Sequence, residues 1–323
     1  MELNDAKSLR DYVWRQKEAR RGLVMVSARF QSGGLDQVKS ASPESNFRKS
    51  LRRFSSDRMG LLGLAIILAF LVATIITMVW TPYPFDQPEL ELKLGSPSFQ
   101  HPLGTDDVGR DILTRLAVGA RYSLMMGVIA IALSAAMGVP IGLIAGYRSG
   151  WWDTTAMRLI DVLMVLPAFV LAVAIVSVLG SGIWSVIIAV AVTTTPAFAR
   201  LTRAIALTLR EQDFVSAAKV SGARDFRILA RHVLPNSLPP LIVQASLGIG
   251  TTILIAAALG FLGLGVQPPT PEWGAMLSRG RTYMSSAPHL VLFPGLAIAL
   301  VVLGFNLIGD SLRDALDPRL KEL

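Results

Sequence analysis

The stretch MGLLGLAIILAFLVATIITMVW, residues 59–80, contains 22 residues and no charged side chain. A helix needs about 20 apolar residues to cross a bilayer core about 30 Å thick. Backbone groups in hydrocarbon have no water to bind, so a stretch of this kind must be helical. The hydrophobic content of 52% would not decide the class alone, because soluble domains are already near half apolar. The clustering of apolar residues therefore predicts a membrane protein.

Five later stretches approach the same length and polarity, at residues 123–145, 159–179, 183–199, 240–262 and 290–308. We therefore predict an all-α membrane protein whose six transmembrane helices form one domain over residues 59–309.

Proline and glycine mark two features within these spans. A proline inside a helix removes a backbone hydrogen bond, so we expect kinks at Pro167, Pro196 and Pro294. Small residues let two helices approach closely in a membrane, and we expect this role for Gly138, Gly142 and Gly146.

The basic residues predict the orientation. If the first residues are cytoplasmic, the segments on that side carry 25 Lys and Arg, against 5 on the other side. Without the tail of residues 1–58 the comparison is 12 against 5, and cytoplasmic loops carry the basic excess. We therefore predict a cytoplasmic basic tail (1–58), a cytoplasmic loop (207–237) and a cytoplasmic C-terminal tail (310–323). The segments 81–115 and 266–289 are expected outside the cytoplasm.

The loop contains DFVSAAKVSGARDFRILARHVLPN, residues 213–236, a polar and basic segment between two apolar spans. Apolar residues recur at helical spacing on both sides of Ser221-Gly222, and Gly222 is suited to a left-handed helix end. Asp225 is a plausible cap or first-turn acid for the second helix, and Pro235 is expected to limit its length. The pattern predicts two short helices joined by a tight turn.

Three interpretations of this loop compete. Ala218, Gly222 and Ile228 have the spacing of a DNA-binding helix-turn-helix, but both ends enter membrane spans within a few residues. Nucleic acid is therefore not an expected partner. A purely structural loop remains an alternative, and a docking surface for a cytoplasmic protein is the favoured interpretation.

The same stretch resembles the EAA loop of permeases from ABC importers. The match consists of Ala217, Ala218 and Gly222, followed by residues 232–236, HVLPN. In that family the loop forms the coupling helix, which sits in a groove of the ATPase subunit. Ser216 occupies the position of the family's Glu, so a salt bridge from that position is not expected here. Glu211 or Asp213 could compensate, or the contact could be mostly apolar and based on shape. The resemblance implies ATPase-coupling roles for Asp213, Phe214, Ser216, Ala217, Ala218, Gly222, Ala223, Ile228, His232, Leu234 and Pro235.

Three further stretches look like parts of dipeptide, oligopeptide and nickel importer permeases. They are HPLGTDDVGRDILTRLAVGARYSL (101–124), FLGLGVQPPTPEWGAML (261–277) and NLIGDSLRDALDPRL (306–320). The match is closest to the C-type permease subunit, including that of glutathione systems. It implies the type I importer permease fold, a bacterial inner membrane location and short peptides as cargo, with nickel or another small solute as the alternative. It also implies a second homologous permease, two ABC ATPase subunits and an extracytoplasmic substrate-binding protein as partners.

The segment 101–115 is expected to contain a helix. Thr105 would cap it, and Asp106–Arg110 and Asp111–Arg115 would form pairs along its surface. His101 near three aspartates raises the possibility of a metal site, but no paired-His spacing supports one.

Two further sets of residues are candidates for function. For the outer gate or binding-protein contact we select Asp106, Arg110, Glu272 and Trp273, although Trp273 is more simply an interface anchor. For the translocation pathway we select polar residues within the spans, which are Thr193, Thr194, Thr195, Gln244, Thr251 and Thr252.

The sequence also indicates whether this chain itself can bind ATP, couple transport to an ion or act as an enzyme. No G-x-x-x-x-G-K-[ST] motif is present, so ATP and Mg²⁺ are expected on the partner ATPases, with no cofactor in this chain. An ion-coupled carrier needs a membrane carboxylate, for which Asp161 is the candidate. An intramembrane enzyme is not expected, because no catalytic pairing of Ser, His or acidic residues lies at membrane depth.

Overall fold

The computed structural model describes residues 43–316. The predicted cytoplasmic tails therefore fall largely outside the described residues, and only 43–58 and 310–316 of them are covered. The chain divides into two compact units, residues 1–51 and 52–323, and all the membrane helices belong to the second unit. A helix at Pro43–Ser56, α2, lies across this boundary. Among the described residues there is no β-strand, only an isolated bridge between Thr105 and Asp111.

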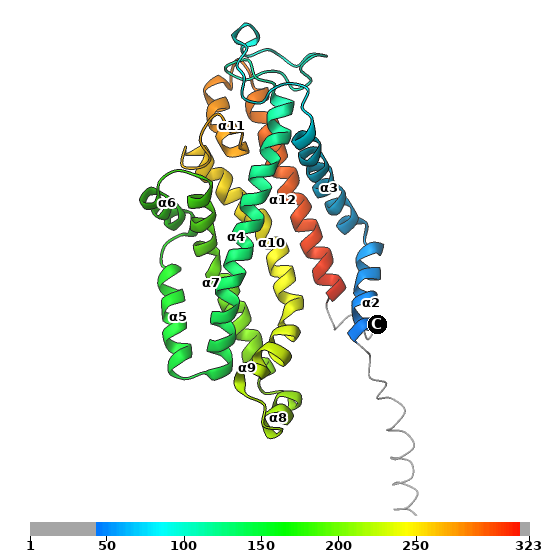
Figure 1. Ribbon diagram of the computed structural model, residues 1–323, viewed down its shortest axis with the longest axis vertical. Helices are drawn as coiled ribbons and strands as arrows, with labels where there is room; N and C mark the ends of the chain where they lie inside the picture. Colours follow the sequence, from blue (N-terminus) through cyan, green and yellow to red (C-terminus); the bar gives the residue numbers. More distant parts are fainter. Residues whose placement is uncertain (1–42, 317–323) are drawn as a thin grey trace, which may run out of the picture. The chain divides into compact units, whose positions relative to one another are not determined.

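Within residues 43–316, five helices are long and apolar enough to cross a membrane. These are α3 (Arg58–Val79), α4 (Ile112–Arg148), α7 (Ile183–Leu209), α12 (His289–Leu316) and α10 (Leu234–Phe261), which continues from α9 (Asp225–Ile228) without interruption. Figure 1 shows α8 (Asp213–Val220) and α9 at one end of these helices and α11 (Trp273–Gly280) at the other. We call these the loop end and the α11 end.

The predicted span 159–179 is not one continuous helix, and the chain bends sharply next to Pro167, where a kink was predicted. α5 (Trp151–Leu163) and α6 (Ala168–Leu179) meet at an angle of 84° across residues 164–167. Pro167 supplies no N–H, and it also disfavours the helical conformation of the residue before it. No side chain in the described part of the chain caps the first turn of α6. If α5 and α6 are taken as one broken span, the described part of the chain has six candidate spans by length and composition, and otherwise five.

Pro196 and Pro294 behave differently from Pro167, because α7 and α12 continue through them without a break. All three positions lack a donor to the preceding turn. The chain turns by 84° at the break before α6, whereas α7 and α12 remain continuous helices at their prolines, so a proline alone does not determine the outcome.

The backbones of α4 and α7 lie in direct contact along the predicted glycines. A Cβ added at Gly138 would lie 2.7 Å from the carbonyl oxygen of Thr195, and one at Gly146 would lie 2.8 Å from the Cβ of Ala206. Between them, a Cβ at Gly142 would lie 2.7 Å from the Cβ of Thr202. The expectation of close helix contact is confirmed. We call this line of contacts the glycine seam.

The remaining helices pack around this pair. Gly63 of α3 contacts the backbone of Gly304 in α12, and Gly274 of α11 contacts the backbone of Ala257 in α10. A buried cluster including Ile112, Trp273 and Val301 fills the α11 end. A second cluster including Val176, Ile187 and Leu259 joins α6, α7 and α10. These contacts fix the positions from which the loop end projects.

The glycine seam yields a stability prediction. Gly142→Leu should destabilise the chain by about 1–3 kcal/mol, because the added side chain overlaps the α7 backbone. Ala132→Leu adds apolar volume on an exposed face of the same helix and should leave stability nearly unchanged. Thermal unfolding of the detergent-purified proteins measures the difference, and equal midpoints for the two variants would contradict the seam.

Candidate functional site

The loop end begins with the predicted turn. α8 ends at Val220, and Gly222 follows with a φ of +79°, in the left-handed region that glycine favours. The N–H of Gly222 donates to Lys219 O at 3.0 Å, and the N–H of Ala223 donates to Ala218 O at 3.0 Å. Among described residues, no atom beyond its chain neighbours lies within 4 Å of a Cβ placed at Gly222. The left-handed backbone conformation, and not a lack of room for a side chain, is therefore the reason that glycine is favoured at this position.

The second helix does not end near Pro235, which corrects the prediction of two short helices. A π-helical turn at Leu229–Val233 (η2) connects α9 directly to α10, and the N–H of Leu234 donates to Leu229 O. A π-turn widens the helix by one residue. This accommodates the missing N–H and the ring of Pro235 at the first turn of α10, so the rod continues.

The inner face of the loop is attached to the ends of α4 and α7. Val215, Ile228 and Val233 are fully buried, in one cluster with Tyr147 and Ala206. The hydroxyl of Tyr147 lies 3.3 Å from Oδ1 of Asp225, and Lys219 Nζ lies 5.3 Å from the Tyr147 ring centre. The loop is therefore fixed to the two helices that the glycine seam joins.

The outer face of the loop combines apolar and cationic side chains. The exposed fractions of Phe214, Val220 and Phe226 are 40%, 90% and 82%. Four cations are exposed on the same segment, namely Lys219, Arg224, Arg227 and Arg231. Large apolar side chains on a polar loop indicate a surface that another protein covers. We call Phe214, Val220 and Phe226 the apolar tip.

The acidic residues near the position of Ser216 have different surroundings. Ser216 is exposed, and so is Asp213 in the first turn of α8. Glu211 pairs with Arg210 at 2.8 Å, so its carboxylate is already engaged. Of the two acids considered as replacements for the family's Glu, Asp213 is the one with no partner among the described residues.

The other predicted loop residues divide between the two faces. Ala217 and Pro235 are exposed, whereas Ala218, Ala223 and Leu234 pack against the buried cluster of the loop. His232 is half-buried, with its ring 6.4 Å from that of Phe214, and its carbonyl accepts a hydrogen bond from Asn236 Nδ2 at 2.6 Å.

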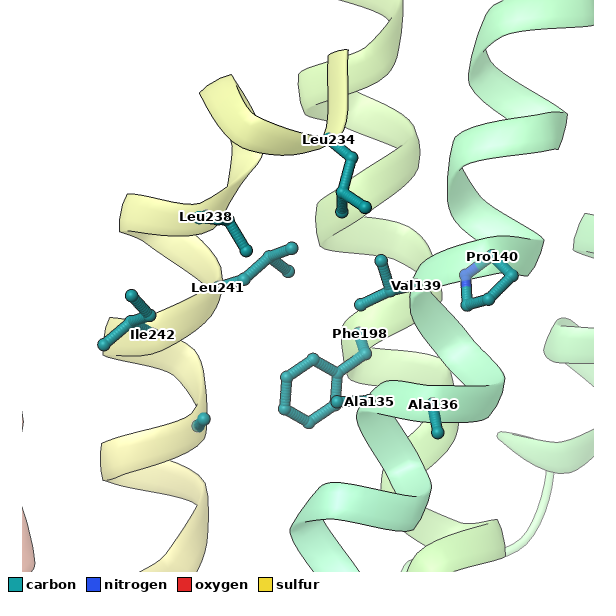
Figure 2. A pocket seen from close by; sticks show the side chains of 10 residues that line it. Ala135, Ala136, Val139, Pro140, Phe198, Leu234, Leu238, Leu241 and Ile242 are labelled. Atoms are coloured by element: carbon teal, nitrogen blue, oxygen red, sulfur yellow. The ribbon is translucent and has the colours of Figure 1, made fainter. Parts of the chain in front are cut away.

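An apolar hollow of about 330 Å³ lies where the loop joins the spans. Figure 2 shows Leu234, Leu238 and Leu241 of α10 on one side, with Val139 of α4 and Phe198 of α7 on the other. The first turns of α10 therefore border an apolar hollow, while Leu234 and Leu241 also pack in clusters with side chains of α4.

The predicted pathway residues lie on two helices, α7 and α10, and differ in their exposure. The hydroxyls of Thr193 and Thr194 donate to Val190 O, and that of Thr195 donates to Ala191 O, all within α7. In α10, Thr252 is buried, with its hydroxyl 3.3 Å from Gly127 O of α4. Gln244 is half-buried and Thr251 is exposed. Most of these hydroxyls therefore satisfy backbone carbonyls.

At the α11 end, α4 begins at Ile112 and not after Thr105, which corrects the predicted helix. The cap is Asp111, which accepts a hydrogen bond from Thr114 N–H at 2.7 Å. Asp111 pairs with His101 at 3.0 Å and not with Arg115. Helical spacing was misleading here because the segment before Ile112 is a turn and an isolated bridge.

Asp106 is the centre of a buried charge network. One carboxylate oxygen accepts from the backbone N–H groups of Val108 and Arg110. The other lies 2.7 Å from Arg110 Nη2 and 3.4 Å from Arg115 Nε. The predicted Asp106–Arg110 pair is confirmed, although it lies in a turn and not on a helix. Among described residues, no group of three or more His, Asp or Glu could hold a metal ion.

Glu272 and Trp273 are almost fully buried, with exposed fractions of 1% and 0%. Glu272 caps α11 by accepting hydrogen bonds from Gly274 and Ala275 N–H, each at 2.8 Å. Burial raises the pKa of Glu272 to about 7, although these hydrogen bonds lower it. Trp273 packs on Phe70 and donates to Leu116 O at 3.0 Å, so the expectation of an interface anchor was wrong.

Two ion pairs between α5 and α7 were not found from the sequence. Arg203 binds Asp153 through two hydrogen bonds of 2.5 and 2.6 Å. Arg200 lies 2.6 Å from Asp161, the residue considered as a carboxylate of an ion-coupled carrier. The partners are 50 and 39 residues apart, and no local spacing connects them.

Comparison with protein families gives two matches. Residues 138–322 match the model described as "Binding-protein-dependent transport system inner membrane component". Residues 45–102 match the model described as "N-terminal TM domain of oligopeptide transport permease C".

The chain is also similar to individual transport proteins. It is 47% identical over 286 residues to the dipeptide transport system permease protein DppC of Alkalihalophilus pseudofirmus, covering 88% of this chain and 93% of the relative. It is 45% identical over 317 residues to the glutathione transport system permease protein GsiD of Escherichia coli, covering 97% and 100%. The MetNI methionine ABC transporter gives a TM-score of 0.52 at 19% identity, covering 63% of this chain and 96% of that one. This last likeness shows the fold alone.

Glu272 predicts how stability depends on pH. Its pKa is about 7 when folded and about 4.5 otherwise, so the folded state binds more protons between these values. Stability should therefore fall as pH rises from about 5 to about 7, by about 3 kcal/mol at most. Glu272→Gln should flatten this dependence in thermal unfolding at pH 5, 6, 7 and 8, whereas Asp86→Asn, at an exposed position, should not. Equal slopes for the wild type and Glu272→Gln would refute the assignment.

Proposed function

This chain belongs to the family of inner membrane components of binding-protein-dependent transport systems, and from that premise we propose how it works. It is a permease subunit of an ATP-driven ABC importer that moves short peptides, of the dipeptide or glutathione type, into the cytoplasm. The likeness to dipeptide and glutathione permeases over most of the chain supports the cargo class. The apolar tip, exposed on a loop that is otherwise anchored, is the observation that supports coupling to another protein.

The proposed topology places the loop end in the cytoplasm and the α11 end outside it. Support comes from the basic residues, which are concentrated in the segments next to the loop end. A bacterial inner membrane location follows from the family. The proposed partners are a second homologous permease, two ABC ATPase subunits that bind ATP and Mg²⁺, and a substrate-binding protein at the α11 end.

We propose that docking to the ATPase is mainly apolar in this chain. Ser216 supplies no charge, and Glu211 is engaged by Arg210. Phe226, Val220 and Phe214 are the exposed groups with the largest apolar surface on the loop. Buried aromatic anchors contribute most of the energy in many protein interfaces. Asp213 and the four exposed cations would then surround the contact.

Transport of this kind alternates between two states that ATP and a loaded binding protein favour differently. The proposed path for the motion is the anchored loop, which is continuous with α10 through the π-turn. The hollow beside Leu234 and Leu238 leaves room for the first turns of α10 to move. Thr251 and Gln244 remain the candidates for weak contacts with a passing peptide. Asp106, Arg110, Glu272 and Trp273 would act by holding the shape of the outer gate.

An ion-coupled secondary carrier gains no support from the structure. Such a carrier needs a carboxylate that can bind and release a coupling ion within the membrane. Asp161 was the candidate, and its carboxylate is paired with Arg200 at 2.6 Å. The chain therefore acts in a complex whose energy comes from separate ATPase subunits.

Substitution of Gly222 tests the coupling function. Gly222→Pro should abolish ATP-driven uptake of a labelled dipeptide or glutathione by the reconstituted importer, because proline cannot adopt a φ of +79°. Gly222→Asn should retain most uptake, since asparagine tolerates the left-handed conformation. Membrane insertion and ATPase activity, measured in parallel, should persist in Gly222→Pro. Normal uptake by the proline variant would refute the coupling role, and uptake without ATPase subunits would refute the proposed function.

Substitution of the apolar tip tests the docking surface. Phe226→Asp should weaken binding of the ATPase subunits by about 2 kcal/mol or more, because a charge replaces an aromatic anchor. Co-purification with the tagged permease measures this. Phe99→Asp introduces the same charge at a fully exposed aromatic of the α11 end and should not change ATPase recovery. Undiminished recovery with Phe226→Asp would exclude the apolar tip from the interface.

A further inference from the structure

Three arginines of α7 and its end bind the segment that precedes the break between α5 and α6. Arg200 pairs with Asp161 and Arg203 pairs with Asp153, both in α5. Arg210, which follows α7, donates to Gly146 O at 3.3 Å and to the hydroxyl of Ser149, at the turn between α4 and α5. The contacts connect the second half of α7 to α5 along its length.

The ion pairs are the main specific attachment of α5. Within α5, all of whose residues are described, Ile160 is the one buried side chain. The turn from α4 passes through Ser149 and Gly150, whose φ values are +55° and +68°, so it constrains only the start of the helix. Arg203 binds Asp153 through two nitrogens of its guanidinium, the arrangement that fixes geometry best.

The same part of α7 is attached to the loop end on its other sides. Gly142 and Gly146 of the seam contact the backbone of Arg203. Ala206, one turn further, is fully buried in the cluster with Val215 and Ile228 of the loop. A displacement of the loop therefore acts directly on the segment of α7 that holds the two aspartates.

The first half of α7 has a different attachment. Val186, Ile187 and Val190 pack with Ala172 and Val176 of α6 in an apolar cluster. Pro196 separates the two halves, and it cannot donate to the carbonyl of the preceding turn. The break at residues 164–167 separates α5 from α6 in the same way. The first half of α7 therefore lies beside α6, and the second half lies beside α5, as Figure 1 shows.

We propose that Arg200 and Arg203 are positioning residues that make α5 follow the loop end during transport, while α6 stays with the first half of α7. The break at residues 164–167 is the hinge that permits this. The proposal rests on the proposed function, because the driving motion comes from the ATPase at the loop. It assigns a role to four charged residues that no local motif identifies.

The experiment measures distances between spin labels in the assembled importer, with and without trapped ATP. The chain contains no cysteine, so labels can be placed by single substitutions. Labels at Leu159→Cys on α5 and Leu303→Cys on α12 measure the distance from α5 to α12, which we call the α5 distance. Labels at Thr208→Cys on α7 and Leu303→Cys measure the distance from the loop-side half of α7 to α12, which we call the α7 distance. All three positions are exposed. Both distances should change with ATP in the otherwise unaltered chain.

Two variants separate positioning from general stability. Asp153→Asn with Asp161→Asn removes both ion pairs at nearly constant shape, and should abolish the ATP-dependent change in the α5 distance while the α7 distance still changes. Uptake per ATP hydrolysed should fall with it. Asp153→Arg with Arg203→Asp rebuilds one pair with reversed charges and should restore the α5 response.

The outcomes are distinct. An α5 distance that still responds to ATP in the doubly neutralised chain would overturn the positioning role. Failure of the reversed pair to restore the response would overturn the role of the ion pair itself. If neither distance responds in the unaltered importer, the proposed function fails and the inference fails with it.

Discussion

The contact between the α4 and α7 backbones is the constraint on which the other features depend. Glycines at three successive turns of α4 bring the two helices together so closely that a Cβ at any of the three would overlap the backbone of α7. In a membrane such contact replaces the hydrophobic effect as the source of specificity, because lipid is as apolar as a leucine. The anchored loop, the apolar hollow and the ion pairs to α5 are all built on this pair of helices.

The sequence predicted those parts of the fold that depend on local physics. Long apolar stretches become helices because hydrocarbon leaves the backbone no other partner. The turn at Gly222 was predicted because a helix often ends in a residue with the left-handed conformation, which glycine adopts readily. Pro235 misled the prediction, since a single π-turn absorbs the missing donor and lets the helix continue. At Pro167 the chain did break, so the effect of a proline depends on whether neighbouring turns can adjust.

Long-range pairing could not be predicted in the same way. Arg203 meets Asp153 only because α5 returns along α7, and the 50 residues between them include a break of 84°. Trp273 was expected at the membrane interface because tryptophan is enriched there. It is buried because Gly119 and Gly274 allow α4, α10 and α11 to close around it. The turn at Gly222 was predictable because its residues are contiguous, whereas the exposure of Val220 and Phe226 was not predicted, and the outer charge network required the fold.

The uncapped first turn of α6 constrains what can surround it in the membrane. Its first N–H groups follow a break flanked by exposed apolar side chains, including Val165 and Leu166. Hydrocarbon does not satisfy such groups, whereas protein or water does. Bare lipid tails are therefore a poor environment for this turn, and contact with protein or water would lower the free energy of the chain in the bilayer.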